Sequence, residues 1–412
     1  MNPQFESDEF PGKPRILFIG GGDSSHTHSW IDLLEGQPFN VRLFSTAHTI
    51  PPAEWKVKTY VTAYNGPALN PDTRARLYDR GKINRLVART LARVGKRVRN
   101  GPDYSERWLA EIIRSWRPHL IHTLGLEPAS YFYAHVRAAN NLADFGKWIV
   151  TVRGGPDLAL HRLLPEYESR IREVLTNCGK LIADNQLNYD YALANGLSQE
   201  QVSSLGIVPG TGGIDVEEIE SRWHDLPSQR RIILWPKAYE CPQSKALPVL
   251  EALRLAWHRL PPFELHMVAA YGEVRMWFQT LPPQLRERCV VRERIPRAEI
   301  LQLMARARVM LAPTLSDGTP NSMFEAMAAG AVPIVSPLDT IRAVVEAEEN
   351  VLFARNLYPE EIAAALVRSM TDDRLVDAIA RTNLELVKRI ADRNEIRAKV
   401  LNFYHSLVRT IG

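Results

Sequence analysis

The chain alternates short apolar runs with longer segments in which apolar residues recur every three or four positions. Short runs bounded by turn residues are typical of buried strands, and the longer spacing is typical of amphipathic helices. Strands are predicted at residues 15–19, 40–44, 120–124, 148–152, 181–185, 202–208, 231–235, 263–268, 289–291, 309–313 and 332–335. Helices are predicted at residues 187–194, 247–257, 300–307, 341–347, 359–370, 373–389 and 394–408. Strands that alternate with helices favour parallel sheets with helices on both faces, an α/β fold.

The length of the chain predicts two domains, because 412 residues exceed what one hydrophobic core usually holds. A glycine-rich break, Pro209-Gly-Thr-Gly-Gly-Ile-Asp215, ends the first set of strands. The predicted division is a mobile segment at 1–14, an N-terminal Rossmann-like domain at 15–208, a linker at 209–230, a C-terminal Rossmann-like domain at 231–390 and a last segment at 391–412.

One stretch joins a strand, a loop, a helix and a strand in the order that builds a parallel sheet. The strand at 309–313 is followed by Asp317-Gly-Thr-Pro-Asn-Ser-Met-Phe-Glu325 and then by the strand at 332–335. Residues 320–322 favour a helix start whose free N–H groups face the crevice, and Gly330 favours its end. Asp317 on the loop and Glu325 inside the helix can then face one cleft. Taken alone, such a pair is more often a turn cap and a solvated helix residue.

The segment resembles the nucleotide-sugar signature of the retaining GT-B glycosyltransferases of family 4, the glycosyl transferases group 1. In that signature two acids with seven residues between them precede an Ala-Met-Ala-x-Gly helix. Here Glu325 is the second acid, and Asp317 stands where the family usually has Glu. The run Asp-Gly-Thr-Pro-Asn-Ser resembles a sub-branch of the family. Matched in order and type over nearly all of residues 15–408, the resemblance implies the GT-B architecture. This consists of two doubly wound domains that face each other across a cleft, with the helix in 391–412 crossing back to the first domain.

The resemblance also implies roles for this segment. Glu325 is expected to hydrogen-bond the nucleotide ribose, and Asp317 is expected to hold the donor sugar together with the backbone N–H groups that follow it. The donor-binding residues implied here are Gly318, Thr319, Pro320, Asn321, Ser322 and Glu325. The nucleotide-diphosphate sugar is a substrate, with UDP favoured over GDP, and no cofactor is expected.

Two lysines mark the start of the predicted C-terminal domain. Lys237 follows the strand at 231–235, and Lys245 precedes the helix at 247–257. Such a pair suits a diphosphate, because each ammonium reaches a phosphate oxygen and the helix N-terminus adds its dipole. In most proteins the pair would be a solvated loop. Here it occupies the place of the family's Arg/Lys pair, which implies that both lysines bind the donor.

A glycine turn follows the first strand. Gly20 and Gly22 match half of the dinucleotide motif G-x-G-x-x-G, but Ser25 takes the third position and no acid ends the second strand. A nicotinamide oxidoreductase is therefore discounted. The resemblance implies that Gly21 and Gly22 let the backbone approach the donor phosphate. His26 is either an acceptor-side residue or a histidine that tethers the loop.

Two further strand ends resemble family segments that carry a histidine. His122, in the strand at 120–124, keeps one such histidine and is an acceptor-side candidate. The strand at 148–152 runs into Arg153-Gly-Gly-Pro-Asp157, where Arg153 replaces the histidine that lies near the reacting sugar in the family. Arginine stabilises negative charge on a departing phosphate but does not reproduce the hydrogen bonding of histidine at the sugar. Arg153 is predicted as catalytic, with Asp317 and Glu325.

Residues 80–99 form a predicted basic amphipathic helix. Its apolar face suits packing on the domain core. Its cationic face suits either plain solvation or attraction to an anionic membrane surface, at about 1 kcal/mol for each basic residue near the lipid. No aromatic residues interleave with the charges and no reader motif appears, so nucleic acid is not an expected partner.

Composition limits the remaining classes. With 45% hydrophobic and 24% charged residues the chain is an ordinary globular protein. The acidic N-terminus predicts no secretory signal, and no apolar run is long enough for a membrane span. Cys178, Cys241 and Cys289 are odd in number and widely spaced, so neither a disulfide framework nor a zinc site is indicated. A cytoplasmic protein, peripheral on the inner membrane face if residues 80–99 touch lipid, is expected.

The hypothesis from sequence is a retaining glycosyltransferase that builds a bacterial surface polysaccharide, such as lipopolysaccharide, or a lipid-linked glycan. The chain has no Asp-x-Asp pair, so charge neutralisation by lysines is expected in place of a metal. The alternatives are a nucleotide-sugar 2-epimerase or a glycan phosphorylase on the same fold, or a non-catalytic scaffold. Conversion of a UDP-sugar without an acceptor would indicate the epimerase, and a need for inorganic phosphate would indicate the phosphorylase.

Overall fold

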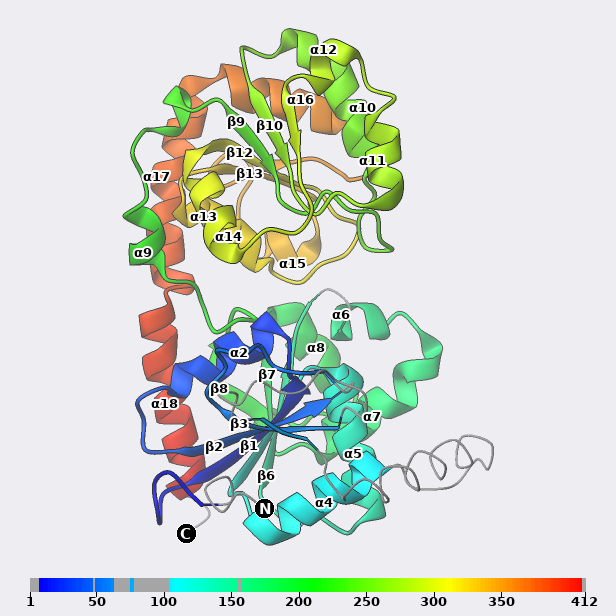
Figure 1. Cartoon of the computed structure of the whole chain (residues 1–412), viewed down its shortest axis with the longest axis vertical. Helices are drawn as coiled ribbons and strands as arrows, with labels where there is room; N and C mark the ends of the chain where they lie inside the picture. The colour runs from blue at the N-terminus through cyan, green and yellow to red at the C-terminus, as the bar shows by residue number, and fades with distance from the viewer. Residues whose placement is uncertain (1–6, 47–48, 63–74, 78–103, 155–156, 410–412) are drawn as a thin grey trace.

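The computed structural model describes residues 7–46, 49–62, 75–77, 104–154 and 157–409, which form two α/β domains stacked end to end (Figure 1). The N-terminal domain is built on a parallel eight-stranded sheet with the order β4-β3-β2-β1-β5-β6-β7-β8. Its strands are β1 (Arg15–Gly21), β2 (Asn40–Thr46), β3 (Lys58–Val61), β4 (Ala75–Leu77), β5 (Leu120–Leu124), β6 (Lys147–Val152), β7 (Lys180–Ala183) and β8 (Val202–Ile207).

Helices cover both faces of this sheet. One face packs on α4, α5, α7 and α8, through side chains such as Trp108, Tyr133 and Val174. The other face packs on α2 and on the last helix of the chain, α18, through Trp30 and Tyr404. The bounds are α2 (Ser25–Ile31), α4 (Tyr104–Trp116), α5 (Tyr131–Ala139), α6 (Leu158–His161), α7 (Glu168–Asn177), α8 (Gln186–Ala194) and α18 (Arg393–Arg409).

The C-terminal domain repeats the plan on a parallel six-stranded sheet with the order β11-β10-β9-β12-β13-β14. Its strands are β9 (Ile232–Trp235), β10 (Glu264–Met267), β11 (Cys289–Val291), β12 (Ala307–Ala312), β13 (Val332–Val335) and β14 (Leu352–Phe353). Its helices are α9 (Val216–Glu220), α10 (Leu247–Ala256), α11 (Gly272–Phe278), α12 (Pro283–Arg286), α13 (Arg297–Arg306), α14 (Asn321–Ala328), α15 (Asp339–Arg342), α16 (Pro359–Thr371) and α17 (Asp373–Ile390). Separate apolar clusters fill its two faces.

The predicted fold class, two doubly wound parallel α/β domains, is confirmed. The predicted strands lie within a few residues of the observed ones. The edge strands β4 and β14, and β3 next to β4, carry no long apolar run, and the sequence pattern did not predict them. In both sheets the strand order reverses beside the first strand, between β1 and β5 and between β9 and β12. Crevices at the carboxyl ends of strands at such a reversal are where open α/β sheets bind ligands.

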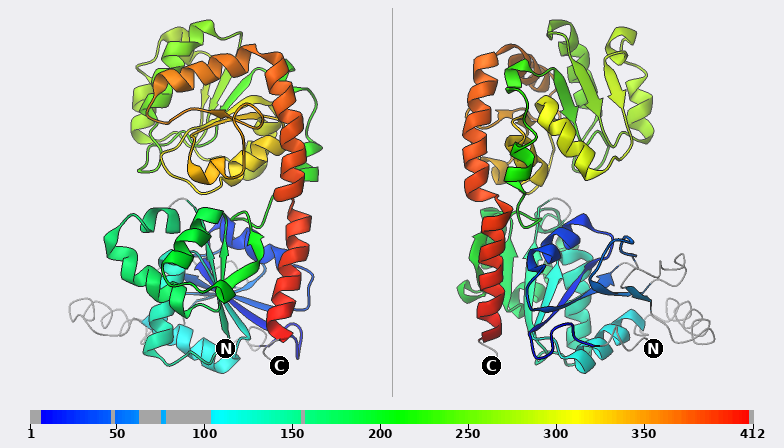
Figure 2. Two further views of the ribbon diagram at one scale, coloured as in Figure 1. Left: turned by 180° about the vertical axis from the view of Figure 1, so that it is seen from behind. Right: turned by 60° about the vertical axis from the view of Figure 1, so that its left-hand side comes forward.

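The chain passes between the domains twice, and the two passages are paired with each other. Ile214 donates its N–H to the carbonyl of Ala391 at 2.9 Å and accepts from the N–H of Arg393 at 2.8 Å. The side chain of Arg393 then bonds the backbone of Ser29 and Thr211, so α18, α2 and the linker are fixed together. Figure 2 shows α17 and α18 as one column along the side of both domains.

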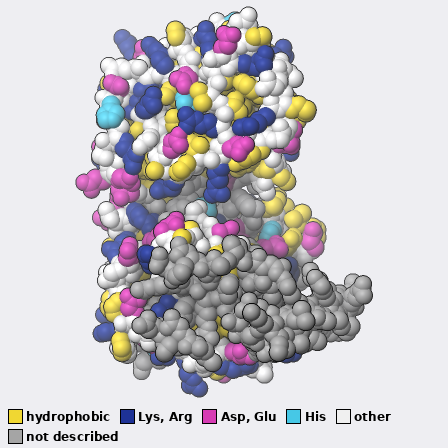
Figure 3. Space-filling model, viewed as in Figure 1, with side chains coloured by type: hydrophobic (Ala, Val, Ile, Leu, Met, Phe, Trp, Pro, Cys, Tyr) yellow, Lys and Arg dark blue, Asp and Glu magenta, His cyan; other side chains and the backbone are white. Residues whose placement is uncertain are grey.

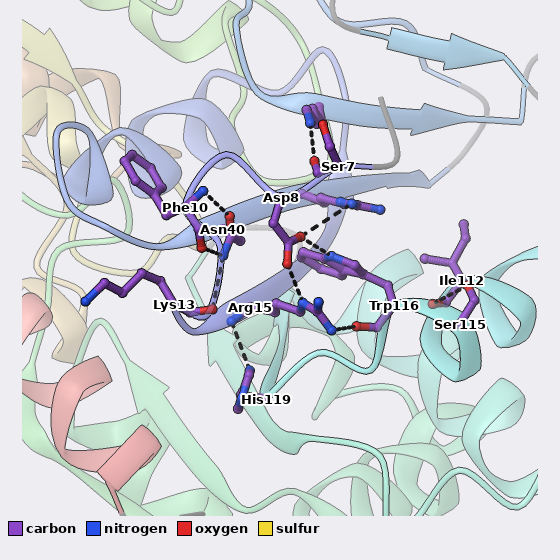
Figure 4. A network of polar contacts seen from close by, with 12 residues as sticks. Ser7, Asp8, Phe10, Lys13, Arg15, Asn40, Ile112, Ser115, Trp116 and His119 are labelled. Carbon is purple, nitrogen blue, oxygen red and sulfur yellow. Dashed lines mark hydrogen bonds and ion pairs between the residues drawn. The ribbon is translucent and has the colours of Figure 1, made fainter. Parts of the chain in front are cut away.

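The start of the described chain is fixed to the N-terminal sheet (Figure 4). Asp8 accepts from Trp116 Nε1 at 2.8 Å and from Arg15 Nε at 2.7 Å. Phe10 exchanges backbone hydrogen bonds with the Asn40 side chain. Side chains of the domain therefore bind Asp8 and Phe10, and the mobility of residues 1–14 stays a prediction.

The predicted basic helix at 80–99 lies outside the described residues. In the part of the chain that the structure describes, no helix combines the length and apolarity that a membrane span requires.

Candidate functional site

The candidate site lies at the carboxyl ends of β9 and β12, where the C-terminal sheet reverses its strand order. Lys237 follows β9 by two residues, and the loop that carries Asp317 follows β12. Lys237 Nζ lies 3.9 Å from Asp317 Oδ2, and a pocket is lined by both side chains together with Pro320 and Ser322. The structure thus brings three predicted donor-binding residues together with Asp317, which was predicted as catalytic.

The loop is built to present backbone N–H groups. Asp317 Oδ1 accepts from the N–H of Gly318 at 2.8 Å, and Thr340 Oγ1 donates to the Asp317 carbonyl. Pro320 caps α14, and no side chain in the described chain accepts from the first N–H groups of this helix. An uncapped helix N-terminus leaves donors and a positive dipole end for an anionic or hydroxylated ligand. Burial raises the pKa of Asp317, and the Lys237 charge opposes that shift.

The N-terminal domain meets this loop at a seam between two glycines. A methyl group on Gly154, which follows β6, would lie 1.8 Å from the Cα atom of Gly318. One on Gly318 would lie 2.5 Å from the Cα atom of Gly154 and 2.6 Å from Asp184 Oδ2. Only glycine permits such an approach of two backbones. Charged side chains of both signs gather around the waist between the domains (Figure 3).

Two buried carboxyl groups support the N-terminal side of the seam. Asp157 accepts from the N–H groups of Leu126 at 2.7 Å and Arg153 at 2.8 Å. Asp184 Oδ2 accepts from the N–H of Gly154 at 2.7 Å. Burial raises the pKa of Asp157 to about 6 and, with the negative charges of Asp157 and Asp317 nearby, the pKa of Asp184 to about 7.

Arg153 carries unused hydrogen-bond donors. Its Nε and Nη2 atoms are buried and have no hydrogen-bond partner among the described residues. Burial lowers the pKa of its guanidinium, and Asp157 and Asp184 oppose the shift. Buried donors without partners are costly, so their presence at a seam points to an anionic or hydroxylated group as the missing partner.

His26 lies on the first turn of α2 and close enough to Arg153 and Lys237 to sense both charges. The residue keeps part of its surface exposed, although many protein atoms surround its ring. This burial and the two positive charges lower its pKa to about 4, so the ring is neutral at pH 7. A neutral imidazole can accept a proton or a hydrogen bond from a substrate hydroxyl.

In the glycine turn after β1, Gly21 and Gly22 have different surroundings, and Gly22 is not free to approach a donor phosphate as predicted. The N–H of Gly22 already donates to Thr49 Oγ1 at 2.7 Å and Ser45 Oγ at 3.1 Å, and its carbonyl contacts His28 Nε2. A side chain on Gly22 would lie 2.5 Å from Ser45 Oγ, so this glycine closes the turn against β2. Gly21 is the last residue of β1 and lies at the mouth of the sheet.

Glu325 lies on α14, inside the helix, and is mostly buried. Its Oε1 accepts from Arg297 at 3.0 Å from Nε and 2.6 Å from Nη2. The second carboxylate oxygen makes no side-chain hydrogen bond with the described residues. Thr319 is buried, and Asn321 Oδ1 accepts from Thr211 Oγ1 of the linker at 3.1 Å.

Two predicted residues are engaged elsewhere. Lys245 Nζ bonds Glu240 Oε1 at 2.8 Å and the Cys241 carbonyl at 3.1 Å, inside its own loop. His122 is fully buried on β5. Its Nδ1 bonds Tyr404 Oη at 2.6 Å and its Nε2 bonds Thr151 Oγ1 at 2.7 Å. Burial, with the Arg153 charge, lowers the pKa of His122 to about 3. The structure therefore places His122 in the packing between β5 and α18, away from the surface of the cleft.

Sequence reasoning did not assign two residues that the structure brings to the site. Asp184 follows the apolar strand β7, at the same edge of the sheet as Arg153, and its position at a strand end was the available signal. Arg297 stands 28 residues before its partner Glu325, and no local pattern links the two. Where side chains are described, no three His, Cys, Asp or Glu residues converge to hold a metal ion. The metal-independent reaction stays a prediction.

The comparisons with known proteins concern the fold and the C-terminal domain. The family model described as glycosyl transferases group 1 matches residues 230–372. No curated protein sequence matches the chain.

Solved structures align over almost the whole chain. Sucrose-phosphate synthase from Thermosynechococcus elongatus has a TM-score of 0.66 at 16% identity and covers 97% of this chain and 100% of its own. HepE from Anabaena in complex with UDP-glucose has a TM-score of 0.65 at 14% identity and covers 95% and 99%. A glycosyltransferase from Rickettsia africae has a TM-score of 0.64 at 14% identity and covers 96% and 99%. At these identities the likeness shows the fold, which is GT-B.

Proposed function

We propose that the chain is a retaining, metal-independent glycosyltransferase. It moves a sugar from a nucleotide-diphosphate donor to a hydroxyl of a glycan or a lipid-linked acceptor. The match of residues 230–372 to the glycosyl transferases group 1 supports the transferase class, and the UDP-glucose bound to HepE, a structural neighbour, supports the donor class.

One observation carries the proposal: the acid-bearing loop, an uncapped helix and Lys237 converge at the strand-order reversal of the C-terminal sheet, against a glycine of the other domain. This arrangement suits a sugar nucleotide because each part of the ligand meets a fitting group. The free oxygen of Glu325 accepts from ribose hydroxyls. Lys237 and the N–H groups of α14 neutralise phosphate, and Asp317 accepts from hydroxyls of the donor sugar.

The reaction in this proposal needs no protein nucleophile. The bond between the anomeric carbon and the phosphate oxygen breaks, and positive charge develops on the sugar ring. The acceptor oxygen forms its bond on the same face, and the departing phosphate takes the acceptor proton, so the anomeric configuration is retained. In this proposal the Nε–H and Nη2–H groups of Arg153, which have no partner among the described residues, stabilise the charge that develops on the phosphate and so lower the barrier.

The acceptor in this proposal belongs to a bacterial surface polysaccharide or to a lipid-linked glycan. An acceptor of that kind would require work at the inner membrane face, for which the basic residues 80–99 are suited by their charge. Flotation with vesicles that contain anionic phospholipid, and no flotation with neutral vesicles, would support this location.

A thermal-shift screen against UDP-, GDP- and ADP-sugars tests the donor. A ligand at about 100 times its Kd should add about 2.7 kcal/mol to the free energy of unfolding. Stabilisation by a sugar nucleotide, followed by release of free nucleotide that depends on an added glycan, supports a transferase. Conversion of the sugar without an acceptor indicates an epimerase, and no stabilisation by any nucleotide sugar would sink the proposal.

A further inference from the structure

We infer that Asp184 is a positioning residue that couples closure of the two domains to the uptake of one proton. This inference rests on the proposed function, because it takes the loop of Asp317 to Thr319 as the loop that binds the donor. Asp184 itself belongs to the opposite domain.

The geometry around Asp184 carries the inference. Its Oδ2 accepts from Gly154 N–H at 2.7 Å, and its Oδ1 accepts from the Nδ2 atoms of Asn185 at 2.7 Å and Asn188 at 3.0 Å. These bonds hold the carboxyl group in one orientation. Gly318 of the other domain lies directly against Oδ2, since a methyl group there would be only 2.6 Å away. The carboxyl group of Asp184 therefore forms part of the surface on which the donor loop rests.

Closure removes this carboxyl group from water and brings a second acid toward it. Asp184 is 4% exposed in the structure, and Asp317 precedes the glycine that covers it. When the domains separate, both the cover and the charge of Asp317 leave. Asp157 stays, because it belongs to the same domain. The pKa of the carboxyl group is therefore lower in the open form than in the closed form, where burial, with the charges of Asp157 and Asp317, raises it to about 7.

The other charged groups around Asp184 set the scale of the effect. Arg153 and Asp157 face it from the loop after β6, and Asp317, with Lys237 beside it, faces it from the C-terminal domain. On the side of α17 and α18, Asp184 lines a cavity of about 270 Å³ with four charged residues on the wall, Arg389, Asp392, Glu395 and Lys399. Two positive and two negative groups on that wall leave little net field, so the acids at the seam dominate.

The sign of the coupling follows from the two pKa values. A group with the higher pKa in the closed form stabilises closure fully below its open-form pKa, and the effect is lost as the pH rises through the closed-form pKa. The ratio of closed to open molecules should fall as the pH rises toward 7, by at most about tenfold for each pH unit, and should level off above pH 7.

Distances between spin labels across the seam measure closure without any nucleotide. In Figure 1, α6 and α11 lie on the side away from α17 and α18, where opening moves the domains furthest apart. Leu163, just after α6, and Met276 in α11 are both strongly exposed and suit replacement by labelled cysteine. Cys241→Ser removes one native thiol, and burial raises the pKa of the Cys178 and Cys289 thiols to about 12, which keeps them unreactive.

We expect the long-distance population of the wild-type sequence to grow from pH 5 to pH 7, and the Asp184→Asn variant to stay closed throughout. Asp190→Asn, an exposed acid on the helix α8 that follows Asp184, is the matched control and should behave as wild type. Asp317→Asn should weaken the pH dependence from the other domain, which keeps the test valid if Asp184→Asn folds poorly. A pH-independent distance in the wild type, or an unchanged pH dependence in Asp184→Asn, would overturn the inference. The absence of sugar-nucleotide binding would instead sink the proposed function and leave the distances as they are.

Discussion

The two sides of the candidate site are assembled in different ways. The C-terminal side comes mainly from one stretch, in which Asp317, the α14 N-terminus and Glu325 follow one another along the chain. The N-terminal side collects Gly154, Asp184 and His26 from three separate strand ends. A contiguous side can be recognised in a sequence, whereas a dispersed side exists only once the sheet has ordered its strands. In the proposed function the contiguous side binds the nucleotide and the dispersed side faces the acceptor.

The largest expected effect is on the contiguous side. Glu325→Ala should reduce turnover of the nucleotide sugar by about 100-fold or more, because a charged acceptor of ribose hydrogen bonds is lost. Turnover and donor affinity should fall together while the melting temperature changes little. Glu299→Ala on the neighbouring helix removes another arginine-paired, partly exposed glutamate and should leave turnover intact. Full activity of Glu325→Ala would remove the main support for the donor site.

A substitution at the seam between the two glycines should reduce turnover almost as strongly. A methyl group in Gly154→Ala would occupy the position of Gly318, so the domains could not meet in the observed arrangement. We expect turnover to fall by about 10- to 100-fold, on the scale that small misplacements of a reacting group produce. Donor binding to the C-terminal domain should persist by calorimetry. Loss of binding and of turnover in equal measure would mean that the two sides are not separable.

A smaller effect is expected from the arginine of the dispersed side. Arg153→Lys keeps the charge but removes the two N–H donors at Nε and Nη2. We therefore expect kcat to fall about tenfold with little change in the KM of the donor. Arg170→Lys, an exposed arginine stacked on Tyr131, serves as the control. An unchanged kcat in Arg153→Lys would leave the buried donors without a role in the chemistry.

The smallest expected effect is on the free energy of unfolding, through His122 in the core of the N-terminal domain. The folded pKa of His122, about 3, lies below its ordinary value of 6.5, so the unfolded chain binds a proton that the folded chain refuses. The free energy of unfolding should therefore decline as the pH falls from about 6.5 toward 3. His122→Gln should flatten this decline in urea titrations, although it loses stability at pH 7, whereas the exposed His258→Gln should not alter the slope. An identical slope in both variants would place the acid sensitivity elsewhere.

Much of the fold could be predicted from the sequence, because parallel strands buried on both faces are nearly continuous apolar runs. For this reason the run at 15–19 lies within β1, and the run at 309–313 overlaps β12 over residues 309–312. The short strand β3 lies between β2 and β4 and is buried over its last three residues, but its Lys-Thr-Tyr-Val sequence is not a continuous apolar run, so it lacks that signal. The segment around Asp8 has no hydrophobic periodicity from which its order could be predicted. Its position depends on side chains far along the chain, such as Trp116.

The site was predictable only where its chemistry follows the chain. Asp317, Gly318 and Pro320 occur together in the sequence and together in the structure. Lys237 joined them because both strand ends flank the reversal in strand order. His122 had the right sequence neighbours, but its side chain points to Tyr404 of α18, a contact between residues 282 positions apart. Arg297 and Asp184 act through partners that only tertiary packing supplies.

The pairing of Ile214 with Ala391 and Arg393 has a mechanical consequence. Two independent connections would let the domains twist and slide against each other. Because these two connections are hydrogen-bonded to each other, they act as a single hinge. Rotation about that hinge needs changes in only a few backbone torsion angles near Gly213 and Ala391. The two domains should therefore open and close by rotation about one hinge axis. The distance between the domains opposite this hinge should then decide whether a ligand can enter or leave the site.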